Sequence, residues 1–202
     1  MHLPFNGGMH VNTIKKLVNK TLINKLVLSR TDYSKTAKLV LGSILGALAA
    51  IFQSAGIFAG IGYVFSILTT WPIVLATVIS IRMGLMTYGL TFFLLAIIQP
   101  SELIVFPFTT GLLGISLGIA FRISKSRFLV TLIGGICLAT GIMIILYGFR
   151  FPVLGPSITS TVKGNVILGI LGFSLVYSWI WMWLSIIGIK VLNKAKVTKI
   201  FY

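Results

Sequence analysis

The feature that most constrains this chain is a run of uncharged residues from position 39 to position 81. The run is too long for one membrane crossing of about 20 residues and long enough for two. Apolar stretches continue to Lys190, separated by short basic segments. Charged residues make up 9% of the 202 positions and hydrophobic residues 57%, whereas an average soluble domain is about a quarter charged. The sequence therefore predicts an all-α, multi-pass protein of the cell membrane.

We expect six transmembrane helices, at about 38–55, 60–81, 83–99, 103–121, 128–148 and 165–190. The first two are separated by the segment Ser54-Ala55-Gly56 and by Gly60, which together offer a tight turn. Without that turn the chain would have five spans. We expect the first span to be retained rather than cleaved as a signal peptide, because its apolar run continues past the candidate cleavage site.

Basic residues predict the orientation, because cytoplasmic loops collect Lys and Arg. Six spans with the N-terminus inside leave only Arg150 and Lys163 outside. The other fifteen of the 17 basic residues are then inside: Lys15, Lys16, Lys20, Lys25, Arg30, Lys35, Lys38, Arg82, Arg122, Lys125, Arg127, Lys190, Lys194, Lys196 and Lys199. Both termini are therefore predicted to be cytoplasmic, whereas five spans would place the C-terminal lysines outside.

The transmembrane domain, residues 38–190, is flanked by two basic segments, 1–37 and 191–202. Within 1–37, apolar residues recur at helical spacing opposite several lysines, which is typical of a helix lying on anionic lipid headgroups. A solvated tail is the alternative. The net charge of +15 could suggest nucleic acid, but that reading needs basic residues clustered beside exposed aromatics. Here the basic residues flank apolar runs, so we expect lipid as a partner and not nucleic acid.

Few side chains could carry out acid–base, nucleophilic or metal chemistry. The acids are Asp32 and Glu102, the two histidines lie near the N-terminus, and the single Cys137 lies in an apolar run. We expect no enzyme, no cofactor and no metal site. Ion-coupled carriers usually keep an ionisable residue within the membrane, and this chain has none well inside a predicted span. The phosphate-binding loop of an ATPase is also absent. If the chain moves a solute, we expect a partner protein to supply the energy.

Small residues repeat every four positions on the first span, at Gly42, Gly46 and Ala50. Such a stripe lets another helix approach closely, because no side chain holds the two backbones apart. The stripe predicts either ordinary packing within the chain or a docking surface for a partner.

Several segments resemble the S components of energy-coupling factor (ECF) vitamin transporters. The segment Lys38-Leu-Val-Leu-Gly-Ser-Ile-Leu-Gly-Ala-Leu-Ala-Ala resembles their opening helix, although its stripe carries glycine where the family usually has alanine. Three further segments resemble their middle helices: Pro72-Ile-Val-Leu-Ala, Arg82-Met-Gly-Leu and Phe106-Pro-Phe-Thr-Thr-Gly-Leu-Leu-Gly-Ile-Ser-Leu-Gly. The middle segment also resembles the YybS-like bacterial membrane proteins, which are uncharacterised, so this resemblance implies no function. The alternative to solute capture is a structural or assembly protein of that kind, with no transported solute.

The resemblance to S components implies capture of a vitamin-like micronutrient from outside. A transmembrane coupling protein and two ATPases would then drive its release inward. The same resemblance implies that the stripe of Gly42, Gly46 and Ala50 docks on the coupling protein.

We expect a solute to bind at the outer ends of the helices, where the chain is irregular. Pro107 interrupts the fourth span there, and backbone freed by proline needs other partners or a wet cavity. Polar groups and aromatic walls are the usual components of a small-molecule site. Interfacial anchoring or packing is the alternative for each aromatic, and simple hydration is the alternative for the glutamate. The candidate substrate-binding residues are Glu102, Arg150, Phe106, Phe108, Tyr147 and Asn165.

Overall fold

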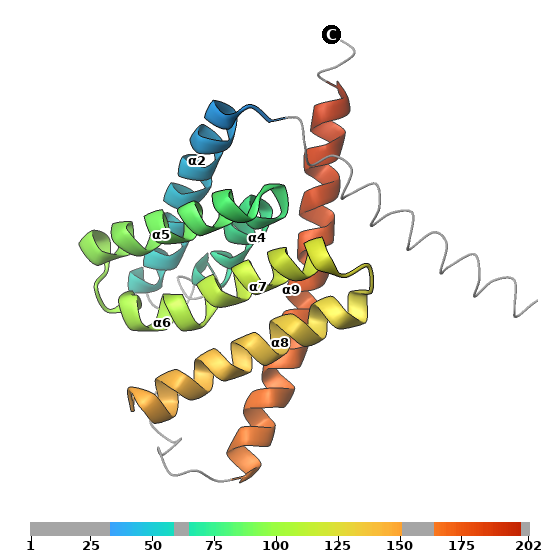
Figure 1. Cartoon of the computed structure of the whole chain (residues 1–202). Coiled ribbons are helices and arrows are strands. Elements are labelled where there is room, and N and C mark those ends of the chain that lie inside the picture. The colour runs from blue at the N-terminus through green and yellow to red at the C-terminus, as the bar shows by residue number, and fades with distance from the viewer. Residues whose placement is uncertain (1–32, 59–64, 151–163, 199–202) are drawn as a thin grey trace, which may run out of the picture.

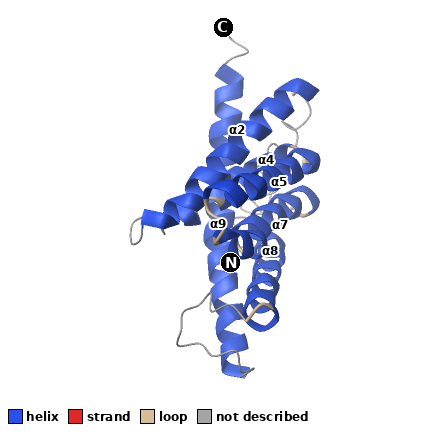
Figure 2. Ribbon diagram, turned by 90° about the vertical axis from the view of Figure 1, so that its left-hand side faces the viewer, coloured by secondary structure: helices blue, strands red, loops and turns tan. Residues whose placement is uncertain are grey.

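In the computed structural model the chain is helical throughout the ranges that the structure describes, which are 33–58, 65–150 and 164–198. Figure 1 shows the arrangement of these helices, and Figure 2 shows no strand among them. The elements are α2 (Lys35–Ser54), the 3-10 helix η1 (Ala55–Phe58), α4 (Thr70–Ile79), α5 (Ile81–Ile98), α6 (Glu102–Phe108), α7 (Thr110–Ile123), α8 (Arg127–Met143), the π-helical turn η2 (Ile144–Gly148) and α9 (Gly164–Thr198). The all-α prediction is confirmed for these residues. The interfacial helix predicted within 1–37 lies outside the described residues.

Within the described ranges, five helical stretches are long and apolar enough to cross a membrane, and they indicate a membrane-embedded protein. They are Lys35–Ser54, Ile81–Ile98, Glu102–Ile123, Arg127–Gly148 and Gly164–Lys190. Each agrees with a predicted span to within about three residues. Their outer surfaces carry large apolar side chains, such as Ile97 at 82% exposure. In water these side chains would form an extended apolar surface, whereas in a bilayer they contact acyl chains.

The second predicted span, 60–81, corresponds to a shorter apolar helical stretch, Phe65–Ile79. At 1.5 Å per residue it measures about 22 Å, less than the roughly 30 Å of a hydrocarbon core. Its α4 part is buried along nearly its whole length, from Thr70 to Val78, with Trp71 the exception. The chain therefore places a short helix in the interior of the bundle, and the count of six spans stays a prediction.

Helices α2 and α5 run parallel, side by side. A Cβ atom at Gly42 would meet Met83 and Thr87, and one at Gly46 would meet Thr87 and Leu90. Both glycines also accept hydrogen bonds through their carbonyl oxygens. Thr87 Oγ1 donates to Gly42 O at 3.1 Å, and Thr91 Oγ1 donates to Gly46 O at 3.1 Å. Because the two helices advance together, residues 55–80 lead from the far end of α2 back to the level at which it began.

That return is made by α4, which packs parallel to α7. Gly114 lies against Ile73, and Gly118 lies against Thr77 one turn further along both helices. The extended residue Ser80 reverses the chain from α4 to α5, so that Thr77 also packs on Gly84. Small residues therefore surround Thr77 on both sides and bring three helices close together.

The last two helices complete the alternation of direction. Gly134 of α8 packs on Leu117 of α7 and on Ser178 of α9. One turn earlier on α8, the Thr131 carbonyl oxygen also accepts from Ser178 Oγ at 2.8 Å. At the start of the same helix, the Arg127 guanidinium lies 5.4 Å from the centre of the Trp183 ring. Helix α8 is therefore antiparallel to α9, which is the longest element and projects beyond the others, toward the side where α2 begins (Figure 1).

Candidate functional site

Glu102, which lies just before the fourth predicted span, turns its side chain toward α2. Glu102 begins α6 after a tight turn in which its backbone N–H donates to Gln99 O at 3.1 Å. Its carboxylate oxygen Oε2 accepts a hydrogen bond of 2.8 Å from Gln53 Nε2, on the last turn of α2. Gln53 is 1% exposed and Glu102 is partly buried, so the contact joins a buried amide to a carboxylate that is still partly exposed.

The same glutamine links the carboxylate to a third helix. Gln53 Oε1 accepts from Thr110 Oγ1 at 2.9 Å, and the Thr110 carbonyl oxygen lies 3.4 Å from the Thr70 hydroxyl. We call these four residues, Gln53, Thr70, Glu102 and Thr110, the Glu102 cluster. The backbone of η1 also lies near the carboxylate, because a Cβ at Gly56 would be 4.0 Å from Glu102 Oε1. Four helices thus contribute to one partly buried polar network.

A break between α6 and α7 brings Glu102 and Thr110 to the same network. Pro107 has no N–H, and its ring clashes with the carbonyl four residues earlier, so a straight helix is disfavoured. The chain departs from helical geometry at Thr109, with φ −116° and ψ −97°. Two hydroxyls bond to carbonyls beside the break: Tyr88 Oη donates to Pro107 O at 3.2 Å, and Thr109 Oγ1 donates to Val105 O at 2.7 Å. The interruption predicted from Pro107 is thus present and supplied with local partners.

The candidate aromatic residues fall in different places. Phe106 is fully buried and its ring lies 5.3 Å from that of Tyr88, so it is a core residue and the packing alternative holds for it. Phe108 is half-buried and contacts Phe149, with ring centres 5.6 Å apart. Tyr147 is half-buried against the main hydrophobic core. Its buried hydroxyl has no hydrogen-bond partner in the described part of the chain.

Arg150 and Asn165 are both exposed, at the two edges of the segment 151–163, which lies outside the described residues. Arg150 follows η2 with a positive φ of 52°. The partner of the Glu102 carboxylate is Gln53, and Arg150 makes no ion pair with it.

The small-residue stripe of α2 faces the interior. Gly42, Gly46 and Ala50 are all buried, and the two glycines are covered by α5. The structure therefore favours packing within the chain, and these two glycines offer no free surface to a second protein. The exposed side of α2 carries other small residues, Ser43 and Ala47, between large apolar ones.

Gln53 is the functional candidate that was not found from the sequence. It is the one amide in the uncharged run from 39 to 81, and a buried polar side chain in a membrane helix needs a partner. A lone amide in an apolar run is therefore a signal that can be found in the sequence, although it does not identify the partner. Among the described residues, no three His, Cys, Asp or Glu side chains gather as a metal site would require.

Comparisons with protein families, with characterised proteins and with solved structures find no match for this chain.

Proposed function

We propose that this chain captures a small solute at the end of the bundle where Glu102 lies. The observation that supports the proposal is the carboxylate turned onto the buried Gln53. An ionisable side chain within a membrane bundle is unfavourable for folding and is usually retained for function. The resemblance to S components extends this proposal: the chain would be the subunit that captures the substrate for an ECF-type importer. A partner coupling protein and ATPases would then supply the energy.

The chemistry of the Glu102 cluster narrows the class of solute. The Glu102 carboxylate oxygen Oε2 accepts from the amide N–H group of Gln53. A solute that binds there would donate a hydrogen bond to the same carboxylate, either beside Gln53 or in its place. We therefore propose a solute with a ring N–H, an amidine or an ammonium group, as many vitamin-like micronutrients have.

The test is a binding screen on the purified full-length chain in nanodiscs, by native mass spectrometry. The probes are a panel of vitamins, nucleobases and amino acids. We expect at least one N–H-bearing compound to bind, and Glu102→Gln to weaken it roughly ten- to a hundredfold. That range corresponds to the loss of a hydrogen bond to a charged group, about 1.5–3 kcal/mol.

Ser101→Ala is the matched control, because Ser101 is the exposed neighbour of Glu102 on the same turn. It should bind the same compound as tightly as the wild type does. Unchanged binding by Glu102→Gln would remove Glu102 from the site. Failure of the whole panel would argue against solute capture altogether.

We further propose that the chain crosses the membrane six times with both termini in the cytoplasm. The alternating helix directions and the distribution of basic residues support this proposal. Reporter fusions at Tyr202 and within the loop 151–163 should then lie on opposite sides of the membrane. A fusion at Tyr202 that reports the outer side would contradict it.

A structural or assembly role without a solute is the second candidate. The burial of Gly42 and Gly46 against α5 favours it, because it removes part of the surface through which an S component would dock. Affinity purification of the chain from its native membrane separates the two functions. Recovery of a stoichiometric ATPase module supports the importer, whereas recovery without such a module, together with an empty binding screen, supports the structural role.

A further inference from the structure

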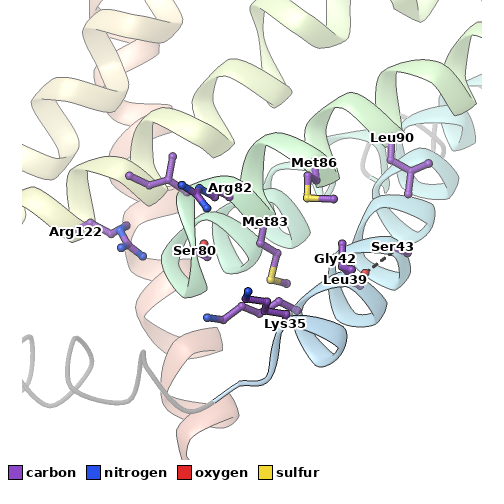
Figure 3. Close-up of a pocket in the computed structure, with 12 residues that line it drawn as sticks. Lys35, Leu39, Gly42, Ser43, Ser80, Arg82, Met83, Met86, Leu90 and Arg122 are labelled. Carbon is purple, nitrogen blue, oxygen red and sulfur yellow. Dashed lines mark hydrogen bonds between the residues drawn. The ribbon is translucent and has the colours of Figure 1, made fainter.

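A cavity of about 800 Å³ lies at the other end of the bundle from Glu102, between the first turns of α2 and α5 and the end of α7 (Figure 3). The 18 residues of α5 separate the two ends by about 27 Å. We call this cavity the basic pocket. Four of the side chains that line it are cationic: Lys35, Lys38, Arg82 and Arg122. Five are large and apolar: Leu39, Ile81, Met83, Met86 and Leu90.

The cationic and the apolar side chains lie mostly at different ends of the basic pocket. On α2 the lysines come first and Leu39 follows, and on α5 Ile81 and Arg82 come first and the two methionines and Leu90 follow. Since α2 and α5 are parallel, their cationic ends share one level. Figure 3 shows the same division, with Arg82 and Arg122 on one side and Met86 and Leu90 on the other. This arrangement fits a ligand that has an anionic head and an apolar body.

The described part of the chain provides no acid to neutralise the pocket. Glu102 is the one acid within the described ranges, and about 27 Å exceeds the Debye length of roughly 8–10 Å at physiological ionic strength. Asp32 lies outside those ranges, and neutralisation of one cation by it would leave three. The positive field is strengthened by the start of α5, where Ser80 makes no side-chain cap and the first backbone N–H groups lack helical partners.

One of the four cations is held in place by backbone. Arg122 Nη1 donates to the carbonyl oxygens of Val78 and Ile79, at 3.1 and 3.2 Å. These are the last residues of α4 before Ser80, where helix carbonyls lack partners. The contacts involve a single guanidinium nitrogen and neutral acceptors, so they fix the side chain without cancelling its charge.

Several side chains that line the basic pocket are exposed at the surface of the bundle. Leu39 is 50% exposed and Met86 is 55% exposed, and Arg82 is also exposed. A bilayer lipid can therefore enter sideways between α2 and α5 with its headgroup at the level of Lys38 and Arg82.

We propose that the basic pocket is a binding site for a phosphate anion, and that its apolar end selects the phosphate of an acidic phospholipid. Basic pockets between membrane helices are suited to anionic headgroups, and an arginine can grip a phosphate through two N–H groups. The acyl chain would lie along Met83, Met86 and Leu90. The proposal is independent of the solute site at the other end of α5.

The test measures lipid binding to the purified full-length chain by native mass spectrometry. The probes are palmitoyl-oleoyl phosphatidylglycerol, phosphatidylcholine with the same acyl chains, and sn-glycerol 3-phosphate, which has no acyl chain. We expect phosphatidylglycerol to bind at least tenfold more tightly than either of the others. The variant Lys38→Gln/Arg82→Gln should lose about twenty- to thirtyfold of that affinity, or about fivefold for each charge removed.

The matched control is Lys125→Gln/Lys190→Gln, which removes two exposed cations that do not line the pocket. It should change the affinity less than threefold. If the double variant in the pocket does not fold, Arg82→Gln alone should give the fivefold loss. Equal losses in the pocket and control variants, or equal binding of the two phospholipids, would overturn the site. Binding of glycerol phosphate within threefold of phosphatidylglycerol would assign the pocket to a free phosphate and overturn the lipid.

Discussion

Gly141→Ala should be among the most destabilising single methyl additions in this chain. A Cβ at Gly141 would clash with the backbone carbonyl oxygen of Phe108 and lie 2.8 Å from its carbon. Backbone cannot move aside as a flexible side chain can, and here it belongs to the break between α6 and α7. We expect a loss of about 3 kcal/mol, the upper part of the range for overpacking. For a chain of this size that is a fall in melting temperature of roughly 6–12 °C.

The measurement is thermal unfolding of the detergent-solubilised chain, followed by tryptophan fluorescence. Gly89→Ala and Gly172→Ala are the controls, because a Cβ at either position would meet nothing within 4 Å. Both should be neutral or slightly stabilising, since alanine favours a helix over glycine by about 1 kcal/mol. A melting temperature for Gly141→Ala equal to that of the controls would show that α8 does not touch the break.

Gln53→Leu should give the second large effect. Leucine is similar in size to glutamine but apolar. The substitution therefore removes the hydrogen-bond partner of both the Glu102 carboxylate and the Thr110 hydroxyl. A buried polar group left without its partner loses roughly 1–3 kcal/mol, and a charged group more. We expect Gln53→Leu to destabilise the chain by about 3 kcal/mol in the same unfolding experiment.

A double-mutant cycle with Glu102→Leu tests the reason for that loss. If Gln53 acts through the carboxylate, the double variant should be less destabilised than the sum of the single variants by about 1–2 kcal/mol. Additive losses would mean that the two side chains do not interact. Glu102→Gln, in contrast, can keep a hydrogen bond to Gln53, and this makes it the suitable variant for the solute-binding screen.

The positions of the long helices were predictable from the sequence, because hydropathy reports which residues lie in the hydrocarbon. The predicted span 83–99 corresponds to the helix Ile81–Ile98 in the structure, and the predicted span 38–55 corresponds to Lys35–Ser54. The short interior helix was not predictable, since residues 60–81 are as apolar as a full span. What distinguishes α4 is that its neighbours surround it, and hydropathy does not record which apolar residues face protein and which face lipid.

The candidate site shows the same limit. The sequence identified Glu102 and the break at Pro107, because a lone acid and a proline stand out in an apolar chain. It did not identify Gln53 as the partner of Glu102, since that contact joins residues 49 positions apart and depends on how two helices rotate about their axes. The stripe of Gly42 and Gly46 was interpreted correctly as a close-approach surface, but spacing alone does not say which helix approaches.

The parallel pairing of α2 with α5 has a consequence for how the chain is synthesised. Residues 35–54 leave the ribosome well before residues 81–98. Gly42 and Gly46 of α2 are therefore not covered by protein until α5 has been synthesised and has packed against them. Helix α4, which lies between them in the chain, is buried by α5 and also by α7, which emerges later still. Assembly of this half of the protein is therefore delayed until the first four helical segments are all in the membrane. Only then can Thr87 and Thr91 donate their hydrogen bonds to the carbonyl oxygens of Gly42 and Gly46 across the α2–α5 interface.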